Sequence, residues 1–375
     1  MKHLTILNKN AGGYTLQEQR KLHEILQEIE GEILVTPDLA TLEYQLEKHQ
    51  DYHPDVLGIG GGDGTASQTL TLVQKIWGTL PQYIAPYALG TMNNWAIPSE
   101  ASDGIIDKIK RSTGFGDTKA VQMAQYLQRI VKAEEKPVTE ELTLLDVNGR
   151  QGFNLGFGLV PKLVWTYYGK SITQYQALQQ ELNQSTASDY EKIFAGIFSA
   201  RPAEKNLIDI VTASETAKKS GGVNAVKAAM SAIKGVLQPS SKEYHFFSEP
   251  LDAEISIDGE NVTLPHQPLG IYVASYEQSN IGLPWLCPYP SPEAREIPEK
   301  MQVVIPYGQP LDIVTSIPNI FRSQHIKNTR YYHASELRLR SNTPLIGEVD
   351  ADFIFGREIV IKSGQTVHCL SLKKT

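Results

Sequence analysis

The chain has 375 residues, 41% of them hydrophobic, so it is long enough to bury two sizeable cores. Its formal net charge of -7 gives no overall attraction to nucleic acid or to an anionic membrane. Its two cysteines, Cys287 and Cys369, cannot build a disulfide framework, and no apolar run approaches the roughly 18 residues of a spanning helix. We therefore expect a cytoplasmic protein with no nucleic-acid partner and at most peripheral contact with membranes.

The first third of the chain alternates short apolar strands with amphipathic helices. Residues Leu16–Glu30 carry apolar side chains at helical spacing. The strands expected around such helices are Leu4–Leu7, Glu32–Val35, Asp55–Ile59 and Gln82–Pro86. This alternation predicts a doubly wound α/β domain over residues 1–117. The tail, about residues 350–375, is a candidate to pack back on it.

A glycine-rich run follows the third of these strands and precedes a helix-like stretch, Ala66 to Trp77. It reads Gly58-Ile59-Gly60-Gly61-Gly62-Asp63-Gly64-Thr65. Glycine lets the backbone N–H groups converge on an anion near a helix start, so the run predicts a phosphate cradle. Asp63 is then free to serve Mg²⁺ or a hydroxyl. The alternative is a tight turn in which Asp63 only caps the helix. The run fits neither G-x-G-x-x-G nor the Walker loop.

A second turn of this kind, Tyr87-Ala88-Leu89-Gly90-Thr91-Met92-Asn93, lies about 25 residues further on. In a parallel sheet consecutive strands end at the same edge, so both turns should face one crevice. For Asn93, an Asx-turn within its own loop is an equal alternative to ligand contact.

From about Asp117 the pattern changes, and we expect a β-rich domain over residues 118–349 with a helical insertion at 171–237. The Asn148-Gly149 pair predicts a hairpin, and Asp258-Gly259-Glu260 predicts a second turn. The expected strands include Tyr126–Lys132, Thr139–Val147, Gln151–Phe157, Tyr244–Phe247, Ala253–Ile257, Gly270–Ala274 and Met301–Ile305. In the insertion, an apolar stripe flanked by Lys227 and Lys234 is either an ordinary packed helix or a movable lid.

Together, these motifs resemble the catalytic family of diacylglycerol and sphingosine kinases. That family pairs Gly-Gly-Asp-Gly-Thr with a Leu-Gly-Thr-x-Asn segment and opens on an Asn-Pro-x-x-Gly motif, where this chain has Asn8-Lys9-Asn10-Ala11-Gly12. Its second domain begins with a strand reading F-x-N-x-x-x-G, and Gly152-Phe153-Asn154-Leu155-Gly156-Phe157-Gly158 looks like that strand. Near its end it carries Asp-Gly-Glu, and Asp350-Ala351-Asp352 stands there in this chain.

The resemblance implies an α/β nucleotide domain followed by a β-sandwich domain, and phosphorylation of a lipid hydroxyl by ATP with Mg²⁺ in the cleft between them. It implies that Asp63 holds the metal and takes part in catalysis, and that Asp352 or Asp350 accepts the proton of the alcohol. The nucleotide and its phosphates would meet Asn8, Gly61, Gly62, Gly64, Thr65, Gly90, Thr91 and Asn93.

Four departures from the family pattern keep alternatives open. The chain has Gln68 where the family commonly has Glu, Ala88 where it has Pro, and Asp352 where it has Glu; no Asp-Gly follows Pro292-Glu293-Ala294. A catalytically impaired lipid- or nucleotide-binding homologue is one alternative. Another is a soluble-substrate kinase of the NAD kinase type, against which the Gly90 to Asn93 segment argues. A homodimer is left open.

Overall fold

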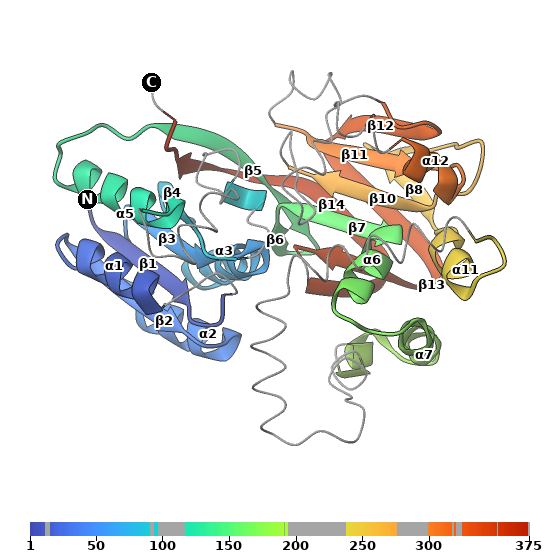
Figure 1. The fold of residues 1–375 in the computed structure, drawn as a ribbon, viewed down its shortest axis with the longest axis horizontal. Helices are drawn as coiled ribbons and strands as arrows, with labels where there is room; N and C mark the ends of the chain where they lie inside the picture. The colour runs from blue at the N-terminus through green and yellow to red at the C-terminus, as the bar shows by residue number, and fades with distance from the viewer. Residues whose placement is uncertain are drawn as a thin grey trace.

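The computed structural model describes residues 1–11, 16–90, 94–96, 117–190, 192–193, 238–275, 299–316, 319, 325–350 and 352–373. Across these residues, fourteen strands join in one continuous sheet, and each half of it has its own hydrophobic core. The two halves lie side by side in Figure 1. The main path through the sheet runs β12-β11-β10-β7-β13-β14-β4-β3-β1-β2. The molecule is therefore a two-domain α/β protein.

The first half is parallel, as the alternating pattern predicts. Its strands are β1 (His3–Asn8), β2 (Gly31–Thr36), β3 (Val56–Gly61) and β4 (Tyr83–Ala88). Its helices are α1 (Leu16–Leu26), α2 (Leu39–Lys48), α3 (Asp63–Trp77) and α5 (Lys119–Val131), with a short 3-10 turn η1 (Asn94–Ala96). Helices α1 and α5 pack together on one face and α2 and α3 on the other, which is the doubly wound arrangement (Figure 1).

The order of the parallel strands fixes where a ligand can enter. Strand β1 lies between β2 and β3, so the chain moves outward from β1 to β2 and then crosses to the opposite side to form β3 and β4. At such a reversal the two connections leave in opposite directions and open a crevice beyond the carboxyl ends of the strands. Asn8 and Gly61 are the last residues of β1 and β3 at this point.

The second half is antiparallel and sandwich-like. Its strands are β5 (Thr139–Val147), β6 (Arg150–Gly152), β7 (Asn154–Gly158), β8 (Glu254–Ile257), β9 (Glu260–Asn261), β10 (Gly270–Ala274), β11 (Met301–Pro306), β12 (Thr329–Ala334), β13 (Glu336–Val349) and β14 (Asp352–Leu370). Helices α6 (Leu159–Tyr167), α7 (Ile172–Asn183), α11 (Lys242–Ser248) and α12 (Pro310–Thr315) and the turn η2 (Ala187–Asp189) accompany them. Side chains of α6, α7 and α11 share a third apolar cluster with Ile346 of β13.

Strand β14 belongs to both halves. Its first part pairs with β13, and its later part pairs antiparallel with β5 and, at His368 and Cys369, parallel with β4. The tail of the chain thus extends the sheet of the first half, while the division of the chain at residue 117 stays a prediction.

Two predicted strands are wrong. Residues Tyr126–Lys132 end helix α5, which packs in the first core, and Tyr244–Phe247 lie in α11. Both short windows are rich in aromatic and β-branched residues, but each follows a helix cap: Thr118 accepts a hydrogen bond from the N–H of Val121, and Ser241 from that of Tyr244. The capped helical period outweighs the local β preference.

Both predicted turns are confirmed. Asn148 and Gly149 (φ 51° and 88°) join β5 to β6, and Asp258 and Gly259 (φ 49° and 85°) join β8 to β9. The predicted insertion begins with α7, whereas Lys227 and Lys234 lie outside the described residues. Among the helices that are described, none has the length and apolarity needed to span a membrane.

Candidate active site

The glycine-rich run forms the junction between β3 and α3. Gly62 is the extended N-cap residue (φ −92°, ψ −173°), and the helix begins at Asp63. A Cβ on Gly61 would collide with the side chain of Thr65, so the backbone turns here only because that atom is absent. The first N–H groups of α3 consequently open toward the crevice at the strand ends, where the helix dipole favours an anion.

The two other N-terminal motifs lie against this junction. The Asn8 side chain donates from Nδ2 to Thr65 Oγ1 at 2.8 Å and accepts the N–H of Asn10 at 2.8 Å, so it links the end of β1 to the first turn of α3. A Cβ on Gly62 would come within 3.3 Å of the Gly90 Cα, and the N–H of Leu89 donates to the Gly61 carbonyl at 3.2 Å. The end of β4 is therefore adjacent to the glycine turn. Thr91 and Asn93 lie outside the described residues.

The C-terminal Asp350 and Asp352 reach the same helix end from the other side. A Cβ on Gly64 would lie 3.0 Å from the Asp350 carbonyl oxygen and 3.7 Å from Asp352 Oδ2. This close approach explains why glycine is needed at position 64, between Asp63 and Thr65. Residues almost 290 positions apart in the sequence thus form one site.

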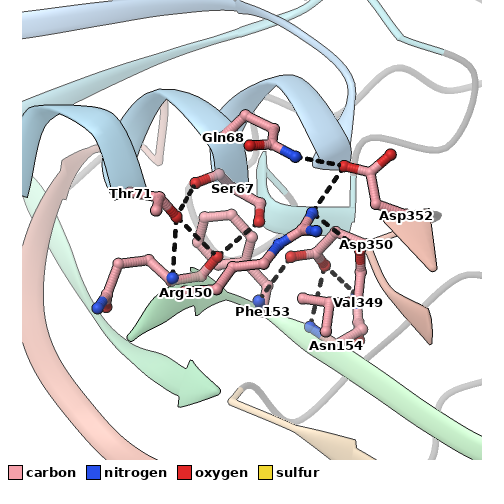
Figure 2. A network of polar contacts seen from close by, with 10 residues as sticks. Ser67, Gln68, Thr71, Arg150, Phe153, Asn154, Val349, Asp350 and Asp352 are labelled. Carbon is pink, nitrogen blue, oxygen red and sulfur yellow. Dashed lines mark hydrogen bonds and ion pairs between the residues drawn. The ribbon is translucent and has the colours of Figure 1, made fainter. Parts of the chain in front are cut away.

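Asp350 is the buried carboxylate of the pair, with 3% of its surface exposed and φ at 51°. Its two oxygens accept the N–H groups of Phe153 at 2.9 Å and Asn154 at 3.0 Å (Figure 2). Burial first, and then the negative charge of Asp63, raise the pKa of Asp350 well above its ordinary value, although these hydrogen bonds oppose the shift. A Cβ on Gly152 would lie 3.1 Å from Asp350 Oδ2. Beside Asp63, Asp350 therefore favours a shared proton or a nearby cation.

Asp352 is the accessible carboxylate, with 44% of its side chain exposed. Its Oδ2 accepts two donors: Arg150 Nη2 at 2.6 Å and Gln68 Nε2 at 2.9 Å (Figure 2). Gln68 comes from α3, Arg150 from β6 and Asp352 from β14. The two departures from the family pattern at Gln68 and Asp352 therefore fit together. The amide of Gln68 donates to Asp352, whereas a glutamate at position 68 would repel it.

Asp63 combines a functional position with a structural bond. It is 5% exposed, and its Oδ1 accepts the N–H of Trp95 at 2.9 Å. The carboxylate thereby holds the η1 turn that follows the second motif against the start of α3. Because Asn also offers a side-chain oxygen, an Asp63→Asn change can keep this bond while removing the charge.

Sequence reasoning missed Arg150, Ser67 and Thr71. Ser67 Oγ donates to the Gln151 carbonyl at 2.5 Å, and Thr71 Oγ1 accepts the N–H of Gln151 at 2.9 Å, so α3 is fastened to β6 beside Arg150 (Figure 2). A single arginine after a hairpin turn carries no sequence signal of its own. The hairpin of β5 and β6 brings it to the end of β13, where Arg150 Nη2 also donates to the Val349 carbonyl at 3.5 Å, next to Asp352.

The carboxylates suit Mg²⁺ better than a metal bound by protein alone. Among the described residues, no cluster of three or more His, Cys, Asp or Glu could hold a metal ion. Nucleotide-associated Mg²⁺ typically takes one or two carboxylates and completes its shell with phosphate oxygens and water. Asp63 and Asp350 fit that requirement, since burial first, and then the charge of Asp63, raise the pKa of Asp350, and a divalent cation relieves the repulsion between the two carboxylates.

Comparison with solved structures places the fold. No protein-family model and no curated protein matches the chain. Three structures from Bacillus anthracis strain Sterne do match. A diacylglycerol kinase is 12% identical, with 99% of this chain and 96% of that one covered and a TM-score of 0.54. Two candidate diacylglycerol kinases are each 14% identical, with coverage of 99% and 97% and TM-scores of 0.59 and 0.55.

The chain therefore has the two-domain fold of bacterial diacylglycerol kinase-like proteins over essentially its whole length. At this identity the likeness concerns the fold, and the chemistry has to be argued from the residues above.

Proposed function

We propose that this protein is an ATP-dependent lipid kinase, which transfers a phosphoryl group to a hydroxyl of diacylglycerol, sphingosine or a related lipid alcohol. The observation that carries the proposal is the meeting of the glycine turn at α3 with the Asp350 to Asp352 turn, at Gly64. A phosphate cradle and a carboxylate that can face an alcohol then lie within one site.

The phosphates are held mainly by main-chain groups in this proposal. Gly61, Gly62, Gly64 and Thr65 supply N–H groups at the start of α3, and Gly90 lets the second turn approach. Asn8, already bonded to Thr65, completes the cradle from β1, and Thr91 and Asn93 are expected to contact the nucleotide. Phosphoryl transfer needs chiefly such positioning and charge neutralisation.

Asp63, with Asp350 behind it, would hold Mg²⁺. The ion would supply charge neutralisation on the phosphate oxygens when bound. The two aspartates contribute the negative charge that selects a cation at this place, and the Asp63 bond to Trp95 keeps that carboxylate fixed.

Asp352 is our choice for the proton acceptor. It is the more accessible carboxylate, and its bonds from Arg150 and Gln68 fix its orientation through one oxygen, Oδ2. A carboxylate that is accessible and oriented in this way can accept the proton of an alcohol. Asp350, held by two main-chain N–H groups inside the fold, is the second candidate.

One observation favours an alternative, a homologue that binds nucleotide or lipid without transferring phosphate. The same 2.6 Å ion pair that orients Asp352 also competes with its use as a base. In an impaired protein the pair would only fasten β6 to β14.

The test is a phosphorylation assay with radiolabelled ATP and Mg²⁺, in which the acceptors are mixed micelles of diacylglycerol or sphingosine, and NAD. Label in a lipid product that disappears in Asp63→Asn supports the proposal. Label in NAD alone would indicate the soluble-substrate kinase. Binding of ATP without any labelled product would identify the impaired homologue.

A further inference from the structure

A row of polar side chains crosses the second half of the sheet, starting at the candidate site. Asn154 of β7 pairs with Ala274 of β10, Ala274 with Gln302 of β11, and Gln302 with His333 of β12. Residues directly opposite each other in antiparallel strands project on the same face. The row therefore runs from Asn154, which contacts Asp350, outward to Gln302 and His333.

Gln302 is an unusual residue for this position. It is 4% exposed, and its neighbours in β11, Met301 and Val303, point into the core on the opposite face of the sheet. On its own face the nearby residues Tyr272, Ala274 and Val304 form a small apolar cluster. An apolar residue would be expected here from packing alone.

The amide of Gln302 has no hydrogen-bond partner in the part of the chain that the structure describes. Both its Nε2 and its Oε1 are buried and unpaired, and the same holds for Nε2 of His333. By contrast, the amide of Asn154 is used, because its Oδ1 accepts the hydroxyl of Tyr272 at 2.6 Å. A buried amide without a hydrogen-bond partner destabilises the folded state. We therefore infer that a bound ligand supplies the hydrogen-bond partners of Gln302.

We propose that Gln302 and His333 form a subsite for the headgroup of a neutral lipid acceptor that carries a hydrogen-bond donor beside its reacting hydroxyl. The inference rests on the proposed lipid-kinase function and names the acceptor class for that site. Two strand spacings separate the Cα atoms of Asn154 and Gln302, about 10 Å, and both side chains lie on one face, so a single headgroup can reach both.

The two unpaired atoms of the Gln302 amide, a donor and an acceptor, determine which headgroups fit. An ester group only accepts hydrogen bonds and leaves Oε1 of Gln302 unmet, whereas an ammonium group only donates and leaves Nε2 unmet. A hydroxyl or a secondary amide meets both. Glu348 of β13 and Asp350, which directly follows that strand, are acidic groups near the Asn154 end of the row, and they disfavour an anionic headgroup.

The experiment compares wild type, Gln302→Met and the control Gln309→Met, which changes an exposed glutamine of the same half. Two acceptors are used, each with two short chains and a primary hydroxyl. 1,2-Dioctanoylglycerol has no further donor, whereas N-octanoylsphingosine adds an amide N–H and a second hydroxyl. We expect Gln302→Met to lower kcat/KM about tenfold for N-octanoylsphingosine and less than twofold for dioctanoylglycerol. Its Tm should equal or exceed that of wild type, because the variant buries no unmet amide.

Equal losses on the two acceptors, or a Tm several degrees below wild type, would overturn the proposal, since either result indicates a purely structural amide. Binding without ATP separates this inference from the kinase function. If N-octanoylsphingosine raises the Tm of wild type but not of Gln302→Met while neither lipid is phosphorylated, the subsite stands and the kinase proposal falls. If phosphorylation occurs with no dependence on Gln302, the kinase stands and the subsite falls.

Discussion

The two halves of the sheet present different kinds of polar group: main-chain groups in the first half and side chains in the second. At the strand ends of the first half, the polar groups are mostly main-chain N–H groups of a turn in which Gly61, Gly62 and Gly64 carry no side chain. On the face of the second half they are side chains, Asn154, Gln302 and His333, on strands far apart in the sequence. Under the proposed function, the first half would hold the phosphate that every reaction shares, and the second half would discriminate between lipid acceptors.

The largest expected effect falls on the first half. Asp63→Asn should lower kcat by about 10²–10³-fold, because it removes the charge proposed to hold Mg²⁺ while Asn still accepts the Trp95 N–H. The measurement is ADP release at saturating ATP and lipid, with Asp51→Asn as an exposed control. Activity above a tenth of wild type would show that the crevice works without this carboxylate.

The Tm of the same variant, Asp63→Asn, should depend on pH differently from that of wild type. Asp350 holds its proton more tightly in the folded than in the unfolded chain, because its folded pKa is raised by burial and by Asp63. The stability that this proton contributes is complete below the unfolded pKa, near 4, and is lost as pH rises through the folded pKa. Without Asp63 that folded pKa falls, so the Tm of Asp63→Asn relative to wild type should increase between about pH 4 and pH 8 in Mg²⁺-free buffer. A difference in Tm that does not change with pH would contradict the coupling of the two carboxylates.

A smaller effect on kcat is expected at Asp352, where the two halves of the sheet meet. Asp352→Ala should lower kcat by about 10²-fold through loss of the proton acceptor, with little change in Tm because the side chain is 44% exposed. Asp352→Glu, which restores the family's longer carboxylate, should keep most of the activity. If Asp352→Ala is fully active, the proton is accepted elsewhere, and Asp350 becomes the residue to test.

The smallest effect concerns the orientation of Asp352. Gln68→Glu replaces a donor with a second negative charge and should lower kcat a few-fold, about the effect of losing one exposed charge-assisted hydrogen bond. Gln68→Ala, which removes the donor without adding charge, should lose less. The measurement is kcat at saturating ATP and lipid for both variants. Equal losses would mean that a negative charge beside Asp352 does not affect turnover.

The same contrast explains what could be predicted from the sequence. The parallel strands and the glycine turn were predictable because their signals are local: an apolar run, a glycine cluster and a helix start within about 20 residues. The Arg150 bond to Asp352 and the Gln302 row depend on strand register across the whole chain, which no local pattern contains. The two wrong strands failed for a related reason, since Thr118 and Ser241 cap helices that short windows around Tyr126 and Tyr244 do not reveal.

Strand β14 has a consequence for how the protein is made. Residues 352–370 supply the neighbour of β4, so the edge of the parallel sheet stays open on the ribosome until this last strand has been synthesised. An unpaired strand edge is a template for association with other chains. We expect the first half to complete its folding only after translation has passed residue 370, and chains ending before β14 to depend on chaperones or to aggregate.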